Sequence, residues 1–458
     1  SQSEGLQIMG FLETRNLDFS NVILLSANEN VLPKSGKENT FIPYSLRKGY
    51  GMTTVEHKNS LYAYYFYRLL QRAENITLMY NTSTETNSKG QMSRFIMQLM
   101  VETDYDFLRS TIGTNTPKKE SARFSVEKTD EIMQKLYSMY DKNSGGTRTF
   151  SPSSLNMYMD CPFRFYLSKI LHVDKPEELS DDVEVNEFGT IFHATMEYFY
   201  NDLMEEVKRS GRDVINSSDY PENLKSPEFI RKIEGYVMKA FKEKYFHIED
   251  EKEGIPELSG VQLINRDAIV RYALAMFALD KEYAPFKVVG TEKKCVIQME
   301  ISIDQDKKVE VEIYGEIDRL YEKDGKLRVV DYKTGGKSKK IESVEGLFNP
   351  NTKDRYKYGL QVMMYAYMYG KQNQVEGIKP SIAYLKDAKC TNDLDLTLGK
   401  DGVVEDAMCY SEEIEDGLKN VMAEGFVPGV PFVARKENKN ACRYCDFTSL
   451  CGVKVPSW

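Results

Sequence analysis

Two predicted strands near residue 320 carry acidic and basic side chains whose types and spacing suit phosphate chemistry. The first strand contains Gly315-Glu316-Ile317-Asp318-Arg319, and the second contains Val330-Asp331-Tyr332-Lys333-Thr334-Gly335. Because side chains alternate between faces along a strand, Asp331 and Lys333 point the same way, and Asp318 on the neighbouring strand can reach them. Two carboxylates meeting on a sheet face form an oxygen site suited to Mg²⁺ or Mn²⁺. A lysine beside them can orient or help to deprotonate an attacking water and can stabilise charge on a phosphate, which is the chemistry of phosphodiester hydrolysis.

The alternative for these residues is a solvated salt bridge on the protein surface. Exposed Asp-x-Lys pairs are common and contribute little to stability, so this explanation would be preferred for a single pair. Here Val329 shares the predicted face, and Val330 and Ile317 are predicted to back it. A buried cluster of two aspartates and a lysine needs a counter-ion or a function, because burying uncompensated charge is costly.

Two pairs of polar residues have the four-residue spacing that places them on one face of a helix. His193 and Glu197 lie in Gly189-Thr190-Ile191-Phe192-His193-Ala194-Thr195-Met196-Glu197, which opens a predicted helix. Gln361 and Tyr365 lie in the helix predicted to follow the strands. Each pair alone also fits a structural role, so the ligand and structural interpretations of His193 remain equally open.

Three of the seven cysteines lie together near the C-terminus, in the spacing Cys442-x₂-Cys445-x₅-Cys451. Alone, this spacing indicates either part of a zinc site or a coincidence. A site needs a fourth ligand, and because no histidine lies nearby, Cys161 is the candidate. The other cysteines have no partner spacing and are interpreted as small apolar residues: Cys295, Cys390 and Cys409.

The elements that must position these residues follow from hydrophobic periodicity. The chain from 151 to 285 is largely helical, and Ser151 and Pro152 supply the signals of a helix start. Asp324-Gly325 is predicted to form a hairpin turn, because both residues tolerate positive φ. Three strands, a helix and a last strand are predicted in this order: 293–304, 309–321, 327–333, 355–369 and 381–385. A mixed α/β domain with helical insertions is therefore expected.

The N-terminal part reads as a separate α/β fragment. Short apolar runs at 21–26 and 76–81 are predicted to be buried parallel strands, with a helix at 61–73 between them. The stretch after this fragment is rich in Lys, Thr and Ser, as in a linker. The predicted division of the chain is a fragment at 1–111, a linker at 112–150 and the main domain at 151–458.

Length, charge and cysteine content limit the classes of function. A chain of 458 residues is expected to form about three domains. The net charge of −9 argues against a protein that coats nucleic acid by bulk charge, but it leaves room for a local basic channel. Seven cysteines do not make a disulfide scaffold, so a reducing compartment is expected. The sequence shows no apolar run of about 18 residues and neither a signal peptide nor a starting Met, as in a piece of a longer chain.

In this order the motifs resemble the RecB-like branch of the PD-(D/E)xK nuclease superfamily. That family's pattern is G-x-x-x-H-x-x-x-E, then G-x-x-D, then D-Y-K-T-G, then Q-x-x-x-Y, and every part occurs here in sequence. The resemblance implies a restriction-endonuclease-like fold and a Mg²⁺- or Mn²⁺-dependent deoxyribonuclease. The implied metal ligands are His193, Asp318, Asp331 and the carbonyl of Tyr332, the implied catalytic lysine is Lys333, and the residues that order the site or contact DNA are Gln361 and Tyr365. The resemblance leaves the roles of Glu197 and Glu316 open.

The cysteines and the N-terminal fragment resemble AddB-type subunits of helicase–nucleases. One cysteine before the nuclease core and three after it look like the iron–sulfur staple of those subunits. The resemblance therefore implies a 4Fe–4S cluster, with Zn²⁺ as the alternative, held by Cys161, Cys442, Cys445 and Cys451. It also implies an AddA-like helicase–nuclease partner.

The N-terminal fragment resembles the second, RecA-type helicase domain of these families. Arg72 falls where an active helicase holds its phosphate-sensing arginine, and the alternative is a solvated helix residue. The fragment departs from the pattern at Asn30, where the family usually has Gly, and at Gln71, where active helicases usually have Thr. No G-x-x-x-x-G-K-S/T motif occurs in the chain, so no ATPase activity is expected from it alone.

Lys337, Lys339 and Lys340 follow the catalytic strand and are either contacts to the DNA backbone or part of a solvated loop.

Taken together, the resemblances imply a DNA exonuclease of the bacterial cytoplasm that processes double-strand breaks. The alternatives are a DNA-binding scaffold whose metal site is idle and a stand-alone RecB-like exonuclease. The intact set of two aspartates and a lysine favours an enzyme.

Overall fold

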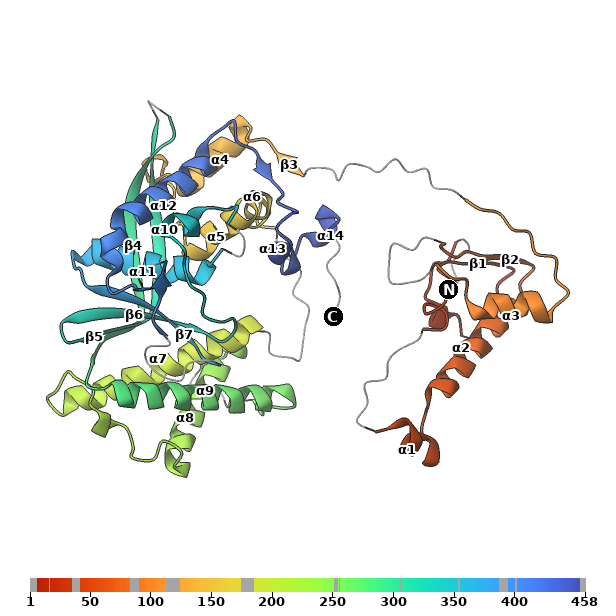
Figure 1. The fold of residues 1–458 in the computed structure, drawn as a ribbon, viewed down its shortest axis with the longest axis horizontal. Helices are drawn as coiled ribbons and strands as arrows, with labels where there is room; N and C mark the ends of the chain where they lie inside the picture. Colours follow the sequence, from red (N-terminus) through yellow and green to blue (C-terminus); the bar gives the residue numbers. More distant parts are fainter. Residues whose placement is uncertain are drawn as a thin grey trace. The chain divides into compact units, whose positions relative to one another are not determined.

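The structure is a computed structural model that describes residues 6–15, 17–34, 42–82, 90–112, 124–173, 185–250, 254, 256–304, 307–352, 355–386, 394–399 and 402–453. Cys390 lies outside the described residues. The chain forms two units, Ser1–Lys118 and Lys119–Trp458 (Figure 1). None of the described helices is long and apolar enough to cross a membrane.

The smaller unit is a two-stranded parallel sheet with helices packed on it. Strand β1 (Asn21–Leu24) pairs with β2 (Asn75–Leu78), and helix α2 (Val55–Leu70) lies between them in the chain. Helix α3 (Arg94–Glu102) joins α2 in a core around the fully buried Phe66. The unit also contains a short helix, α1 (Tyr44–Gly49).

The prediction of parallel strands is confirmed for β1 and β2, but the prediction that both are buried is wrong. Val22 is the one buried residue of the two strands, and Ile23 is 64% exposed. Parallel strands are buried on both sides only when helices cover both faces of the sheet. Among the described residues of this unit, the core lies on the Val22 face alone.

The larger unit is built on a four-stranded sheet (Figure 1). Strands β4 (Lys287–Ser302), β5 (Lys308–Lys323) and β6 (Lys326–Lys333) pair antiparallel, and β7 (Ile378–Tyr384) pairs with β6 in parallel. The predicted order of three antiparallel strands, a helix and a strand is thus confirmed. The predicted turn is also present, with φ of +52° at Asp324 and +75° at Gly325.

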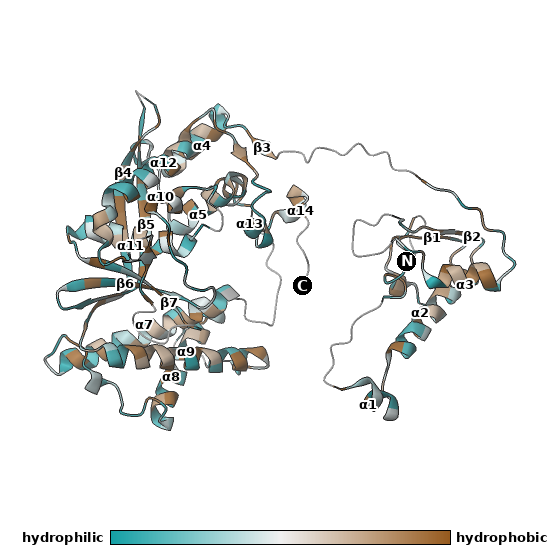
Figure 2. Ribbon diagram, in the orientation of Figure 1, coloured by the Kyte–Doolittle hydropathy of each residue, from teal (hydrophilic) through white to brown (hydrophobic). Residues whose placement is uncertain are grey.

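Helices cover both faces of this sheet. One face is covered by α7 (Val185–Arg209), α8 (Pro227–Ala240) and α9 (Val261–Tyr283), and the other by α4 (Asp130–Tyr140), α5 (Pro152–Asp160), α11 (Lys357–Asn373) and α12 (Ser411–Phe426). Figure 2 shows hydrophilic and hydrophobic residues mixed along α7 and α9, as expected for helices with one side on a core. The remaining elements are short: β3 (Ser125–Val126), α6 (Pro162–Phe165), α10 (Val344–Phe348), β8 (Thr397–Leu398), β9 (Gly402–Val403), β10 (Phe432–Val433), α13 (Lys439–Arg443) and α14 (Thr448–Cys451).

Helix α4 lies within the residues predicted to be a linker. Its Met133 and Leu136 are buried, and the ring of Tyr140 stacks on Phe150 with 4.4 Å between centroids. Thr129 caps the helix by accepting a hydrogen bond from the backbone N–H of Ile132. The Lys-, Thr- and Ser-rich composition therefore concealed an amphipathic helix, and the described part of this stretch from 124 onward belongs to the larger unit.

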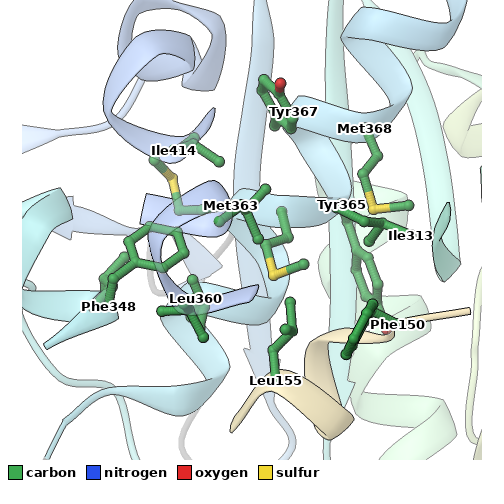
Figure 3. Close-up of a cluster of buried hydrophobic side chains, with 14 of the residues drawn as sticks. Phe150, Leu155, Ile313, Phe348, Leu360, Met363, Tyr365, Tyr367, Met368 and Ile414 are labelled. Carbon is green, nitrogen blue, oxygen red and sulfur yellow. The ribbon is translucent and has the colours of Figure 1, made fainter. Parts of the chain in front are cut away.

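Helix α11 forms the centre of the core on its side of the sheet. Every residue from Gly359 to Gly370 is buried except Gln361. Figure 3 shows side chains of α11 packed among residues of five other parts of the unit: Phe150, Leu155, Ile313, Phe348 and Ile414. Val329 belongs to this core and Val330 to the core on the opposite face, as predicted, but Ile317 lies on the side of Val329.

Candidate metal centre

Three acidic residues lie in one row across β4, β5 and β6. Arg319 of β5 pairs with Thr291 on one side and with Val330 on the other. The residue before it on β5, Asp318, therefore lies level with Glu292 of β4 and Asp331 of β6. Asp318 is 8% exposed and Asp331 is 1% exposed. The sheet thus concentrates negative charge at a nearly buried point.

Helix α7 brings His193 to the same point. Its Nδ1 lies 3.4 Å from Oδ1 of Asp318, and its Nε2 lies 3.2 Å from the carbonyl oxygen of Tyr332. The backbone N–H of Tyr332 donates to Oδ2 of Asp318 at 2.6 Å. One ligand atom each from His193, Glu292 and Asp318 lies within 4.8 Å of the others. Among the described residues, no other group of three or more His, Cys, Asp or Glu side chains is as compact.

Lys333 and Asp331 form a buried ion pair beside these ligands. Nζ of Lys333 donates to Oδ1 of Asp331 at 3.0 Å and lies 2.8 Å from Oδ2. Oδ2 is nevertheless buried without a partner in hydrogen-bonding geometry. Burial opposes the charged amine, but the carboxylate of Asp331 outweighs it and raises the pKa of Lys333. A charged lysine donates hydrogen bonds and cannot accept a proton, which favours the orienting role over proton removal.

Burial and mutual charge shift the pKa values of four groups in the site. Burial raises the pKa of Asp331 to about 6, and burial together with the charge of Asp318 raises that of Glu292 to about 7. Burial works against a charged His193, yet the carboxylate of Asp318 outweighs it and raises the histidine pKa to about 9. In turn, burial opposes the charged form of Asp318, but His193 keeps the pKa of that carboxyl below its usual value. The free site therefore has a negative electrostatic potential, which favours a bound cation.

These residues fit a divalent cation. Carboxylate oxygens, a peptide carbonyl and one imidazole nitrogen are donors that Mg²⁺ and Mn²⁺ accept. Oδ2 of Asp331 lies 2.8 Å from Nζ of Lys333 but accepts no hydrogen bond of good geometry, so it retains capacity to bind a cation. Of the side chains predicted to be ligands, His193 and Asp318 belong to the compact group, whereas Asp331 does not, and the ligand set stays a prediction.

Glu292 is a member of the site that the sequence did not indicate. It lies just before the strand predicted to begin at 293, and only the pairing of β4 with β5 places it opposite Asp318. Its φ of +44° is unusual for a residue with a side chain, and it lies near an irregularity in pairing between Val288 and Gly290. The charges of Glu316 and Glu197 also raise the pKa of Glu292, which places both close to the site.

Helix α11 adds a hydrogen-bonded pair to the site. Nε2 of Gln361 donates to the hydroxyl of Tyr365 at 2.8 Å. A Cβ on Gly315 would lie 2.9 Å from two atoms of the Tyr365 ring, so a glycine on β5 lets this ring approach the strand. Burial and the charge of Asp331 raise the pKa of Tyr365, which keeps its hydroxyl neutral near that carboxylate.

Cys161, Cys442, Cys445 and Cys451 line one pocket, formed where α6 meets α13 and α14. Phe163 and Phe447 pack beside the sulfurs in a small apolar cluster. No three of these sulfurs lie within 4.8 Å of one another. A tetrahedral zinc site, with Zn–S bonds of about 2.3 Å, holds its sulfurs about 3.8 Å apart. Burial raises the pKa of three of the thiols: Cys442, Cys445 and Cys451.

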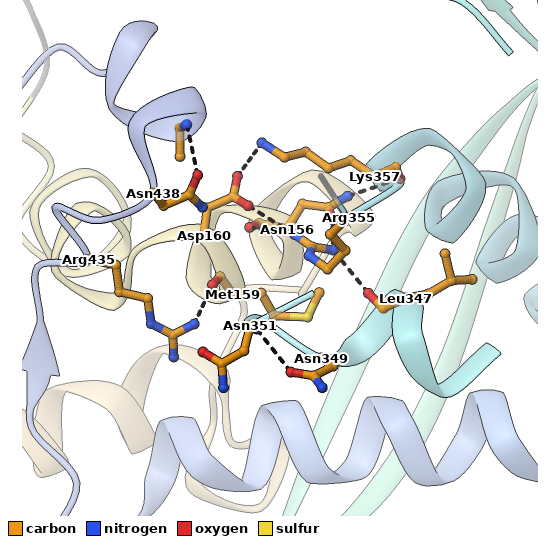
Figure 4. Close-up of polar contacts among 11 residues, drawn as sticks. Asn156, Met159, Asp160, Leu347, Asn349, Asn351, Arg355, Lys357, Arg435 and Asn438 are labelled. Carbon is orange, nitrogen blue, oxygen red and sulfur yellow. Dashed lines mark hydrogen bonds and ion pairs between the residues drawn. The ribbon is translucent and has the colours of Figure 1, made fainter. Parts of the chain in front are cut away.

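A buried ion pair joins the residue before Cys161 to the start of α11 (Figure 4). Nη2 of Arg355 lies 3.1 Å from Oδ1 of Asp160, and Nη1 donates to Oδ1 of Asn156 at 2.6 Å. Lys357 pairs with the other oxygen of Asp160. From the C-terminal side, Arg435 donates to the carbonyl of Met159 at 2.6 Å. Helix α5 thus contacts both the beginning of α11 and the segment that leads to the last three cysteines.

The other residues predicted to be functional lie on exposed surfaces. Lys337, Lys339 and Lys340 are exposed after β6. Arg72 follows the end of α2, with its side chain 66% exposed and 2.7 Å from Asp18.

Asn30, which stands where the helicase pattern usually has Gly, has φ of +71°. Glycine and asparagine both adopt this conformation, which explains how Asn can replace Gly there.

The interpretation of the two remaining described cysteines as apolar residues agrees with the structure at one position only. Cys295 is fully buried within the core between the sheet and α11. Cys409 is exposed, because it lies in the short 3₁₀ turn Ala407–Tyr410 that leads into α12. Its sequence spacing gave no indication of this exposure.

Comparison with known proteins yields a family and distant relatives. Residues 149–452 match the profile described as the PD-(D/E)XK nuclease superfamily. An ATP-dependent helicase/deoxyribonuclease subunit of Clostridioides difficile (strain 630) is 24% identical over 299 residues, covering 63% of this chain and 23% of that protein. The protein of the same name from Carboxydothermus hydrogenoformans is 25% identical over 213 residues, covering 44% and 18%. The matches thus span less than a quarter of the length of these curated relatives.

Proposed function

Because the chain belongs to the PD-(D/E)XK nuclease superfamily, we propose that it is a divalent-metal-dependent deoxyribonuclease of the AddB-like, RecB-family type. The observation that carries this proposal is the convergence of His193, Asp318 and the peptide group of Tyr332 beside the buried pair of Asp331 and Lys333. A purely structural salt bridge would not need a histidine and two further acids beside a buried aspartate.

The proposed ligands are His193, Asp318, Asp331 and the carbonyl of Tyr332, with Glu292 added from the structure. When bound, the cation neutralises charge on a phosphate and makes a water easier to deprotonate. The N–H of Tyr332 fixes one oxygen of Asp318, which leaves the other turned toward His193. Lys333 keeps its charge through Asp331 and has further N–H groups to donate to a phosphate oxygen or to an attacking water. Gln361 orients the Tyr365 hydroxyl at the edge of this site.

We further propose that Cys161, Cys442, Cys445 and Cys451 hold a 4Fe–4S cluster. Four cysteines that line one pocket provide the ligand set of such a cluster, with zinc as the alternative. The raised thiol pKa values mean that thiolates form here only with a positive partner. The cluster would join the beginning and the end of the larger unit. Iron and sulfide analysis of anaerobically purified protein tests this, and stoichiometric zinc would contradict it.

The biological setting is proposed from the relatives. Their name describes part of a helicase/deoxyribonuclease, so we infer that this chain acts in the processing of DNA double-strand ends with an AddA-like helicase–nuclease partner. In this proposal the smaller unit derives from a helicase domain, with Arg72 at its phosphate-sensing position. Lys337, Lys339 and Lys340 would contact the DNA backbone, so binding would weaken steeply with salt.

Cleavage of end-labelled linear DNA tests the nuclease proposal. The protein would be compared with its Asp331→Ala and Lys333→Ala variants in Mg²⁺, Mn²⁺ and EDTA. We expect cleavage by the parent in the presence of metal only, and none by either variant. A parent that binds DNA with its cysteine cluster intact but does not cleave would favour the non-catalytic scaffold.

A further inference from the structure

An exposed tyrosine lies directly against the catalytic lysine. Tyr358 is the second residue of α11, and the centroid of its ring lies 4.9 Å from Nζ of Lys333. Its side chain is 38% exposed, whereas Tyr356, two residues before it, is 7% exposed and shares a 2.6 Å hydrogen bond with Tyr384. A large ring that is partly exposed beside a reacting group is available for contact with a substrate.

The loop after β6 passes against the same ring. Gly336 has φ of +87°, and a Cβ there would lie 3.3 Å from ring atoms of both Tyr358 and Tyr384. This loop carries three exposed lysines: Lys337, Lys339 and Lys340. The Tyr358 ring therefore contacts both the amine of Lys333 and the start of a loop that carries basic residues.

We propose that Tyr358 contacts the substrate by stacking its ring on an unpaired nucleobase next to the cleaved phosphate. This inference rests on the proposed nuclease function and names the part of the substrate that this residue recognises. Aromatic rings beside a basic track hold single strands, because every base has an aromatic face and the lysines attract the backbone. A paired base is covered by its neighbours and cannot stack there without leaving the duplex. The contact would therefore favour single-stranded ends with little dependence on sequence.

An abasic scan of the substrate tests the stacking directly. Single-stranded oligonucleotides, each with one abasic position, would be cleaved in Mg²⁺ by the parent protein, by Tyr358→Phe and by Tyr358→Leu. We expect Tyr358→Leu to lower kcat/KM on the intact strand by about tenfold, mainly through KM, because a stacked base is lost. Tyr358→Phe should stay near the parent. One abasic position should lower kcat/KM of the parent by a similar factor and cause no further loss in Tyr358→Leu.

Other outcomes overturn this inference. If Tyr358→Leu loses the same factor on every abasic strand as on the intact strand, the ring acts only on Lys333 and touches no base. An unchanged kcat/KM in Tyr358→Leu also contradicts the inference. If the parent cleaves nothing, the nuclease proposal fails instead. Binding of the same strands in EDTA, measured by fluorescence anisotropy, then still decides whether Tyr358 and one base act together.

Discussion

Among the single residues, Asp331 has two roles that conflict: it pairs with Lys333 in the free protein, and it is proposed to bind the cation. Its carboxylate is 1% exposed, and it lies in the same row as Asp318 and Glu292, which makes its charged form costly. Lys333 offsets part of this cost by pairing with it. The lysine and a bound cation therefore compete for the same carboxylate, although the chemistry needs both.

Lys333→Met separates these two roles. Removing the amine takes away a positive charge beside the cation, so we expect Mn²⁺ to bind as tightly as in the parent or more tightly. Cleavage should fall by at least about 100-fold, because a donor to the charged phosphate is lost. Asp331→Asn is the matched variant, and it should lose both metal binding and cleavage. Equal loss of Mn²⁺ affinity in the two variants would contradict this division.

The affinity for metal should rise with pH. A ligand must lose its proton before it binds, and the pKa of His193 is raised to about 9 in the free protein. Below that pH the histidine holds a proton that the cation must displace, so affinity falls as pH falls. Displacement from His193 alone predicts a rise of about 50-fold in Mn²⁺ affinity between pH 7 and pH 9, because half of the histidine is still protonated at pH 9. Electron paramagnetic resonance titration measures this, and His193→Ala should flatten the rise, whereas a steep rise retained in that variant would disprove it.

At the scale of elements, the contact between β5 and α11 fixes the position of Tyr365. A methyl group at Gly315 would lie 2.9 Å from the ring. We expect Gly315→Ala to lower the free energy of unfolding by about 1–3 kcal/mol and to reduce cleavage by moving Tyr365. Gly235→Ala is the control, because this α8 glycine has no atom within 4 Å of its Cβ position and should gain up to about 1 kcal/mol. Urea unfolding of both variants tests the difference, and an unchanged Gly315→Ala would contradict the tight contact.

Strand alternation and turn chemistry made much of the site predictable. Asp318, Asp331 and Lys333 meet because β5 and β6 are adjacent, and the Asp324-Gly325 turn fixes which residues face each other. Glu292 was not predictable, because its place depends on the pairing of β4 across an irregularity. Helix α4 was missed for a different reason, since its apolar residues are spaced among the polar ones of an apparent linker. Local patterns thus identify hairpins, whereas long-range pairing must be observed.

At the scale of the whole molecule, the hydrophobic cores divide at the boundary between the two units. The described core residues of the smaller unit fall between Phe11 and Met100, and those of the larger unit between Phe124 and Val453. We therefore expect a chain of residues 124–458 to fold alone, to bind Mn²⁺ and to unfold at the temperature of the larger unit in the full chain. Differential scanning calorimetry of both chains tests this, and an aggregated or unfolded fragment would show that the smaller unit is required.

In the proposed site, residues from α7, β5 and β6 hold one cation. Crystals of the protein grown with Mn²⁺ would locate the ion by its anomalous scattering. We predict a single strong peak within bonding distance of His193, Asp318, Asp331 and the carbonyl oxygen of Tyr332, with Glu292 close by. An ordered site without a peak, or Mn²⁺ bound elsewhere while Lys333 still pairs with Asp331, would contradict this site.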